Sequence, residues 1–139
     1  MTDWHDLDGG MYMENILDHN AHPHNRGPLP DADFRHEEES LSCGDRLALA
    51  ARLDSDRIAE ARFEGSGCAL SVAAASMLTD ALVGKATKEA LAMTDADVFR
   101  LLGFEVGISR LRCATLALKT FQQGLSDHLQ SHGKATENK

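Results

Sequence analysis

The spacing of the apolar residues changes from strand-like to helical just after the segment Gly65-Ser66-Gly67-Cys68. Before it, residues 46–53 and 59–64 alternate apolar residues with polar or small ones around the turn Asp54-Ser55-Asp56, which predicts a β-hairpin. After it, helical spacing predicts helices from Ala69 to Gly84, over 87–93 and 95–102, and from Ser109 past Leu125. Strands followed by helices predict an α+β fold, with the sheet packed on one side by helices.

The first forty residues add shorter elements to this plan. A helix is expected from Met11 to about Asn20, ending near Pro23. An edge strand is expected from Asp33 to about Ser40. The whole chain, 1–139, is long enough for one domain, and its polar ends, 1–10 and 130–139, are expected to be flexible.

Charge and composition exclude several classes of function. The formal net charge is −8, with no basic stripe that would follow a nucleic-acid backbone. The N-terminus is polar and acidic, unlike a signal peptide, and no apolar run approaches the roughly 18 residues of a membrane span. We therefore expect a cytoplasmic, soluble protein with reduced thiols and no nucleic-acid or membrane partner.

The chain has three cysteines, Cys43, Cys68 and Cys113, and Asp45 follows the first by two residues. Three thiolates and one carboxylate can form a four-ligand set for zinc or for an iron–sulfur cluster. A lone cysteine is more often a small buried apolar residue than a ligand. Three cysteines that each lie in a glycine turn or away from an apolar helix stripe favour the ligand interpretation.

The settings of the thiols support this interpretation. Cys68 falls at the start of a predicted helix, where unpaired N–H groups and the helix dipole favour negative charge. Cys113 lies between Arg110 and Arg112. Cys43 and Asp45 lie in the connection between the first two strands, where a glycine lets the chain turn so that both side chains can converge.

A second candidate site is the histidine cluster His19, His22 and His24. Its spacing could suggest another metal site, but Pro23 interrupts the helix between the histidines. A turn-and-docking role is the preferred interpretation. The serines of the helix after Cys68 have no paired general base, so the chain has no hydrolytic triad.

Several segments together resemble the U-type iron–sulfur assembly proteins, the IscU/SufU family. The matching segments are Asp18-His19-Asn20-Ala21-His22-Pro23-His24-Asn25-Arg26-Gly27, Cys43-Gly44-Asp45, Gly65-Ser66-Gly67-Cys68-Ala69-Leu70-Ser71, Ala75-Ser76-Met77-Leu78-Thr79 and Arg112-Cys113-Ala114-Thr115-Leu116. The resemblance covers about residues 11–128. It implies an α+β fold with a three-stranded antiparallel sheet, a site at one end, and a cysteine desulfurase as sulfur donor.

The residue before the third cysteine divides the family into two branches. Scaffold-type members carry a histidine there, which can bind the metal, whereas zinc-dependent SufU-type members carry a basic residue. This chain has Arg112, which stays protonated and cannot coordinate, so the resemblance leaves Asp45 as the fourth ligand. The scaffold type also has a Leu-Pro-Pro-Val-Lys segment for a dedicated Hsp70 chaperone. That region here is Gly103–Ile108 and does not match, so we do not expect that partner.

Three functions remain open. The first is sulfur transfer, in which the protein would act as a zinc-dependent sulfurtransferase. Cys43 would accept sulfur from a SufS-like desulfurase, zinc would bind Cys43, Asp45, Cys68 and Cys113, and Arg112 would assist. Downstream Suf-type assembly proteins or apo-proteins would receive the sulfur.

The second function is a non-enzymatic scaffold on which the same four residues hold a [2Fe–2S] cluster. The third is a structural zinc domain without turnover, although structural sites commonly use four Cys or His ligands rather than Asp.

Overall fold

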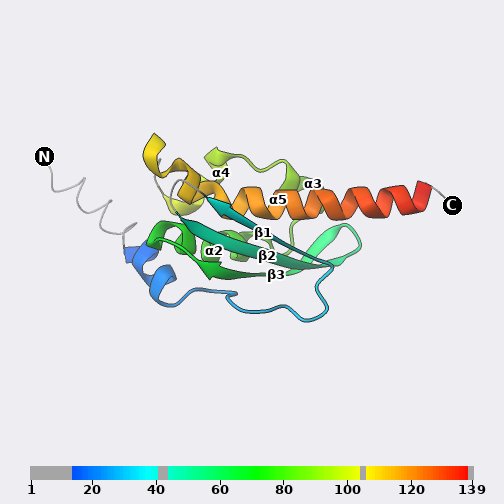
Figure 1. Ribbon diagram of the computed structural model, residues 1–139, viewed down its shortest axis with the longest axis horizontal. Helices are drawn as coiled ribbons and strands as arrows, with labels where there is room; N and C mark the ends of the chain where they lie inside the picture. The colour runs from blue at the N-terminus through cyan, green and yellow to red at the C-terminus, as the bar shows by residue number, and fades with distance from the viewer. Residues whose placement is uncertain (1–13, 41–43, 104–105, 138–139) are drawn as a thin grey trace, which may run out of the picture.

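The computed structural model describes residues 14–40, 44–103 and 106–137, with side chains described up to Ser131. Residues 14–21 are helical. The remaining elements follow in the order β1 (Phe34–Ser40), β2 (Asp45–Asp54), β3 (Arg57–Ser66), α2 (Ala69–Leu82), α3 (Thr87–Leu91), α4 (Asp95–Leu102) and α5 (Ile108–Glu137). Figure 1 shows α5 running beside the sheet and extending past its end.

The three strands form an antiparallel sheet in the order β1-β2-β3. Phe34 pairs with Ala51 at one end of the β1–β2 ladder, and Ser40 pairs with Asp45 at the other. The β2–β3 ladder is the predicted hairpin, closed by the predicted turn after Asp54. The expected α+β fold with a three-stranded antiparallel sheet and packed helices is therefore confirmed.

The inner face of the sheet carries the large apolar side chains, because alternate residues of a strand point the same way. Leu47, Leu49 and Phe63 lie on this face and are at most 1% exposed. Helix α5 packs on β1 and β2, while α2 packs on β3 and on α5. Phe121 of α5 is fully buried, with its ring 5.4 Å from that of Phe34. Each such side chain contributes about 1.5–3 kcal/mol through its burial.

The outer face of the sheet is polar. Its central strand carries Ala48 and Ala50, whose small side chains are covered by charged residues of the neighbouring strands. The ion pairs on this face are Arg35–Glu37 at 3.6 Å, Arg35–Glu64 at 3.7 Å, Arg46–Glu37 at 3.3 Å, Arg46–Glu39 at 3.2 Å, and Arg52–Glu60 and Arg62–Glu60, each at 2.9 Å. Exposed pairs of this kind contribute about 0–1 kcal/mol each. The helices thus cover the face opposite to these charges, as expected.

The ends of the chain differ slightly from the expectation. The predicted first helix continues one residue past Asn20, and its first residues, 11–13, lie outside the described part. Helix α5 continues to Glu137, through most of the segment 130–139. The flexibility of that segment and of residues 1–10 stays a prediction. None of the described helices is long and apolar enough to cross a membrane.

Candidate metal centre

Three of the four predicted ligands come together in space. One ligand atom each of Asp45, Cys68 and Cys113 lies within 4.8 Å of the corresponding atoms of the other two. Asp45 opens β2, Cys68 is the N-cap of α2, and Cys113 lies in the second turn of α5. The fourth predicted ligand, Cys43, lies outside the described residues. The cluster thus joins the end of the sheet to both large helices.

Asp45 is a buried carboxylate, only 3% exposed. It shares the inner face of β2 with Leu47, so the strand register turns its side chain toward the helices. A carboxylate in such a place requires hydrogen-bond donors. The backbone N–H of Cys68 donates to Oδ1 at 3.0 Å, and the hydroxyl of Ser71 donates to Oδ2. Asp45 therefore caps the N-terminus of α2 from a neighbouring element.

Gly67 allows the carboxylate to approach this closely. A Cβ at position 67 would lie 3.0 Å from Cγ of Asp45 and 3.1 Å from Cβ of Ser71. These distances are tighter than ordinary van der Waals contact, so a larger residue would push the strand away from the helix. The second glycine of the Gly65-Ser66-Gly67-Cys68 segment is therefore explained by the position of Asp45.

The two described thiols differ in access. Cys113 is 3% exposed, whereas Cys68 is partly exposed. The guanidinium Nη1 of Arg110 lies 4.0 Å from Sγ of Cys68, where its charge can offset that of a thiolate. The sequence predicts an assisting role for Arg112 instead. Arg112 is exposed and lines a surface pocket of about 430 Å³, together with Ser40 and Lys119 among others, and its role stays a prediction.

Two residues of the centre are not found by sequence reasoning. In the sequence, Arg110 is notable only as a neighbour of Cys113, whereas in the structure its guanidinium lies 4.0 Å from Sγ of Cys68. In the sequence, Ser71 is notable only as a possible nucleophile, whereas in the structure its hydroxyl donates to Asp45. The available signal for Ser71 was its place as the third residue of a helix whose N-cap is a candidate ligand. For Arg110 no signal distinguished it from Arg112.

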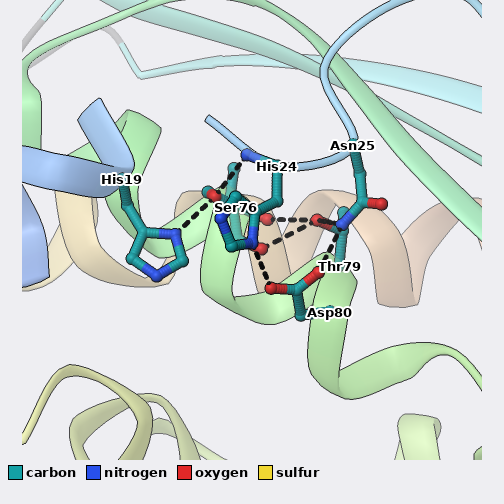
Figure 2. A network of polar contacts seen from close by, with 7 residues as sticks. His19, His24, Asn25, Ser76, Thr79 and Asp80 are labelled. Atoms are coloured by element: carbon teal, nitrogen blue, oxygen red, sulfur yellow. Dashed lines mark hydrogen bonds and ion pairs between the residues drawn. The ribbon is translucent and has the colours of Figure 1, made fainter. Parts of the chain in front are cut away.

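The histidine cluster attaches the N-terminal segment to α2 rather than forming a metal site. Figure 2 shows His19, His24 and Asn25 pointing at three side chains of α2. The hydrogen bonds are His19 Nδ1–Ser76 Oγ at 2.6 Å, His24 N–Ser76 Oγ at 2.8 Å, His24 Nδ1–Asp80 Oδ2 at 2.6 Å, Asn25 Nδ2–Thr79 Oγ1 at 2.9 Å and Asn25 Nδ2–Asp80 Oδ1 at 2.8 Å. His22 is exposed. Within the described residues, only the Asp45–Cys68–Cys113 group has the spacing of metal ligands.

Two groups in this network are expected to make the attachment sensitive to acid. Burial of the ring and the charge of His24, whose ring centroid is 4.5 Å away, lower the pKa of His19. Burial acts to raise the pKa of Asp80, but its hydrogen bonds to His24 and Asn25 leave it below its usual value. The folded state therefore binds fewer protons than the unfolded state, and acid weakens the attachment.

We expect the free energy of unfolding of the metal-free protein to fall between pH 7 and 5, and His19→Gln to reduce this fall. The reason is that the unfolded histidine takes up a proton near pH ~6.5, whereas His19 in the folded protein resists it. Urea unfolding at pH 7, 6 and 5 measures the effect. Leu17→Gln, at an exposed position two residues before His19 with no titratable group, is the control and should keep the wild-type slope. Equal slopes in wild type and His19→Gln would contradict the prediction.

Comparison with known proteins places the chain among relatives of the same architecture. The family model described as "NifU-like N terminal domain" matches residues 11–135. The "Zinc-dependent sulfurtransferase SufU" of Bacillus subtilis is 34% identical, over 84% of this chain and 90% of the relative. The "Iron-sulfur cluster assembly scaffold protein IscU" of Aquifex aeolicus is 33% identical, over 91% and 81%.

A solved structure supports the same relationship. The putative iron–sulfur cluster assembly scaffold protein for the SUF system from Fervidobacterium islandicum superposes with a TM-score of 0.66 at 29% identity. It is matched over 81% of this chain and 94% of its own. With its three-stranded sheet, its helices and its matched length, this chain belongs to the NifU-like N-terminal domain family.

Proposed function

We propose that this protein acts in iron–sulfur cluster biogenesis as a zinc-bound sulfur acceptor that receives sulfur from a cysteine desulfurase. The observation that carries the proposal is the group of two thiols and one carboxylate within 4.8 Å. A relative named as a zinc-dependent sulfurtransferase supports it. Sulfur transfer by free thiols requires a compartment that keeps them reduced, and we propose that this compartment is the cytoplasm.

The residues of the centre suit zinc. Zinc is bound tetrahedrally by cysteine sulfur and by aspartate oxygen, and Asp45, Cys68 and Cys113 supply three such ligands. Cys43 is the proposed fourth ligand, because it lies two residues before Asp45 in the chain. When bound, zinc would keep the thiols deprotonated and hold strand and helices together.

Sulfur transfer itself is assigned to Cys43. Its thiolate attacks the terminal sulfur of a persulfide on the donor protein, forming a new S–S bond at Cys43. The S–S bond of the donor breaks, and its electron pair stays on the donor cysteine as a thiolate. The exchange is balanced and needs no external oxidant, and the resulting persulfide on Cys43 can pass its sulfur on by the same reaction.

The cations near the centre have separate proposed roles. Arg110 lies close enough to Cys68 to offset the negative charge of its thiolate. Arg112 and Lys119, in the adjoining pocket, can receive acidic groups of an incoming partner. The donor is proposed to be of the SufS-like type, and the acceptors to be downstream Suf-type assembly proteins or apo-proteins.

A second candidate function is that of a scaffold for a [2Fe–2S] cluster at the same residues. It is favoured by relatives from Aquifex aeolicus and Streptococcus pyogenes, both named as cluster assembly scaffolds. Both functions use the same thiols and differ in whether sulfur leaves as a persulfide or inside a cluster.

Mixing the zinc-loaded protein with a SufS-like desulfurase and cysteine, without reductant, should add one sulfur atom to Cys43. Peptide mass spectrometry locates the added sulfur, and sulfide release measures desulfurase turnover. Cys43→Ser should abolish the stimulation of turnover, because it removes the thiolate to which sulfur transfer is assigned. Thr2→Ser, at a position far from Cys43 in the sequence, is the control for making a substitution and should stimulate desulfurase turnover as the wild type does.

The scaffold function makes the opposite prediction for the same mixture. Desulfurase turnover would not respond to the protein, and anaerobic addition of iron would yield a cluster that an apo-ferredoxin can take up. That pair of results would overturn the sulfur-transfer proposal. A protein that binds zinc but neither stimulates turnover nor forms a cluster would instead be a structural zinc domain.

A further inference from the structure

Ser71 touches every described member of the metal centre. Its hydroxyl donates to Oδ2 of Asp45, and lies 3.5 Å from Sγ of Cys68 and 3.2 Å from the carbonyl oxygen of Cys113. The side chain is fully buried in the first turn of α2. A single hydroxyl therefore links the sheet, α2 and α5 at the point where the ligands meet.

The hydroxyl of Ser71 is directed out of its own helix. Two buried threonines donate to the carbonyl four residues earlier in their own helix: Thr79 of α2 to Ala75 at 2.9 Å, and Thr120 of α5 to Leu116 at 2.7 Å. For Ser71, the residue four positions earlier is Gly67, which precedes the helix. Ser71 thus has no carbonyl of its own helix as an acceptor, and its proton is available to Asp45.

We propose that Ser71 is the positioning residue of the metal centre, orienting the Asp45 carboxylate toward the two thiols. The inference rests on the proposed function, because it assumes that Asp45 binds the metal. The Cys68 N–H holds Oδ1 at 3.0 Å and Ser71 holds Oδ2, so both oxygens are fixed. Rotation of the carboxylate would break a bond that is strengthened by charge. Metal binding therefore begins from an already oriented ligand.

The hydrogen bond from Ser71 leaves Oδ2 able to bind a metal. Each carboxylate oxygen has two lone pairs, so Oδ2 can accept the hydrogen bond from Ser71 and keep a second lone pair for a metal ion. The carbonyl oxygen of Cys113, 3.2 Å from the Ser71 hydroxyl, is a second acceptor that holds this hydroxyl between the sheet and α5. Ser71 would therefore hold the carboxylate both without and with the metal.

Ser71→Ala is expected to raise the zinc dissociation constant by about 10–100-fold, the effect usual for groups that orient a metal ligand. Chelator competition with the purified full-length protein measures this constant without any activity assay. The matched control is Ser76→Ala, which removes an equally buried hydroxyl from the same helix, at the histidine network. It should bind zinc within about twofold of wild type, since distant sites act independently.

A double-mutant cycle distinguishes orientation of Asp45 from a general effect on the fold. In the Asp45→Ala background, Ser71→Ala should change zinc affinity by no more than about twofold, because its target is gone. Equal affinity of wild type and Ser71→Ala would overturn the inference and leave the proposed function intact. An undiminished effect of Ser71→Ala without Asp45 would also overturn it. Failure of the wild type to bind zinc would overturn the proposed function and, with it, the assigned role of Ser71.

Discussion

Zinc is expected to raise the Tm of this protein by about 10–15 °C, and Cys68→Ser is expected to remove most of that increase. The proposed ligands Asp45, Cys68 and Cys113 come from β2, the N-cap of α2 and α5, so a bound ion would add to the packing and hydrogen bonds that already join these elements. A ligand that binds only the folded state, at about a thousand times its dissociation constant, adds about 4 kcal/mol to the free energy of unfolding. Differential scanning calorimetry with and without zinc measures the shift.

The metal-free proteins provide the control for this prediction. Cys68 is partly exposed, and serine is close to cysteine in size, so the substitution alone should cost no more than about 1 kcal/mol. Wild type and Cys68→Ser should therefore unfold at similar temperatures in the presence of a chelator. A zinc-dependent increase of equal size in the variant would show that Cys68 is not a ligand.

The regular elements could be predicted because their side chains face either the core or solvent. The alternation of apolar with polar or small residues in 46–53 reflects the two faces of β2. Leu47 packs against the helices, and Ala48 lies next to charged residues of the neighbouring strands. The helical spacing after Ala69 likewise records which sides of α2 and α5 are buried. Element ends were less certain, since the last turns of a helix make few contacts with the core.

For the centre, the sequence indicates the candidate ligands but not the residues around them. Cysteine and aspartate are recognisable by their chemistry, so Asp45, Cys68 and Cys113 could be grouped before any contact was known. The proposed role of Ser71 depends on its contact with Asp45, which is 26 positions away in sequence. Such a contact is visible only in the folded chain. The difference between Arg110 and Arg112 depends on the direction in which each side chain leaves α5, which residue type alone does not reveal.

The two glycines before Cys68 affect both the packing of the sheet and the geometry of the candidate metal centre. Gly67 lets Asp45 approach α2, whereas Gly65 lets β3 approach β2. Gly65 pairs with Leu47 and has a φ of 121°, a conformation that other residues rarely adopt. The same short segment therefore ends the sheet and sets the position of the candidate ligand Asp45.

Gly65→Ala is expected to lower the free energy of unfolding by about 3–5 kcal/mol, through backbone strain and overpacking acting together. A Cβ there would overlap the carbonyl oxygen of Arg46 and lie 3.0 Å from Cα of Leu47. Both atoms belong to the backbone of the central strand, so no side chain can move aside to relieve the clash. Urea unfolding of the metal-free protein measures the loss.

Gly84→Ala separates the two causes of this loss. Gly84 also has a positive φ, 91°, but a Cβ there would meet nothing within 4 Å. Its substitution should cost only the strain of a left-handed conformation, about 1–2 kcal/mol. A loss in Gly65→Ala no larger than in Gly84→Ala would mean that β2 and β3 can separate freely at this point. The larger loss should be accompanied by weaker zinc binding, because β3 leads within two residues to Cys68, so its displacement would shift this candidate ligand.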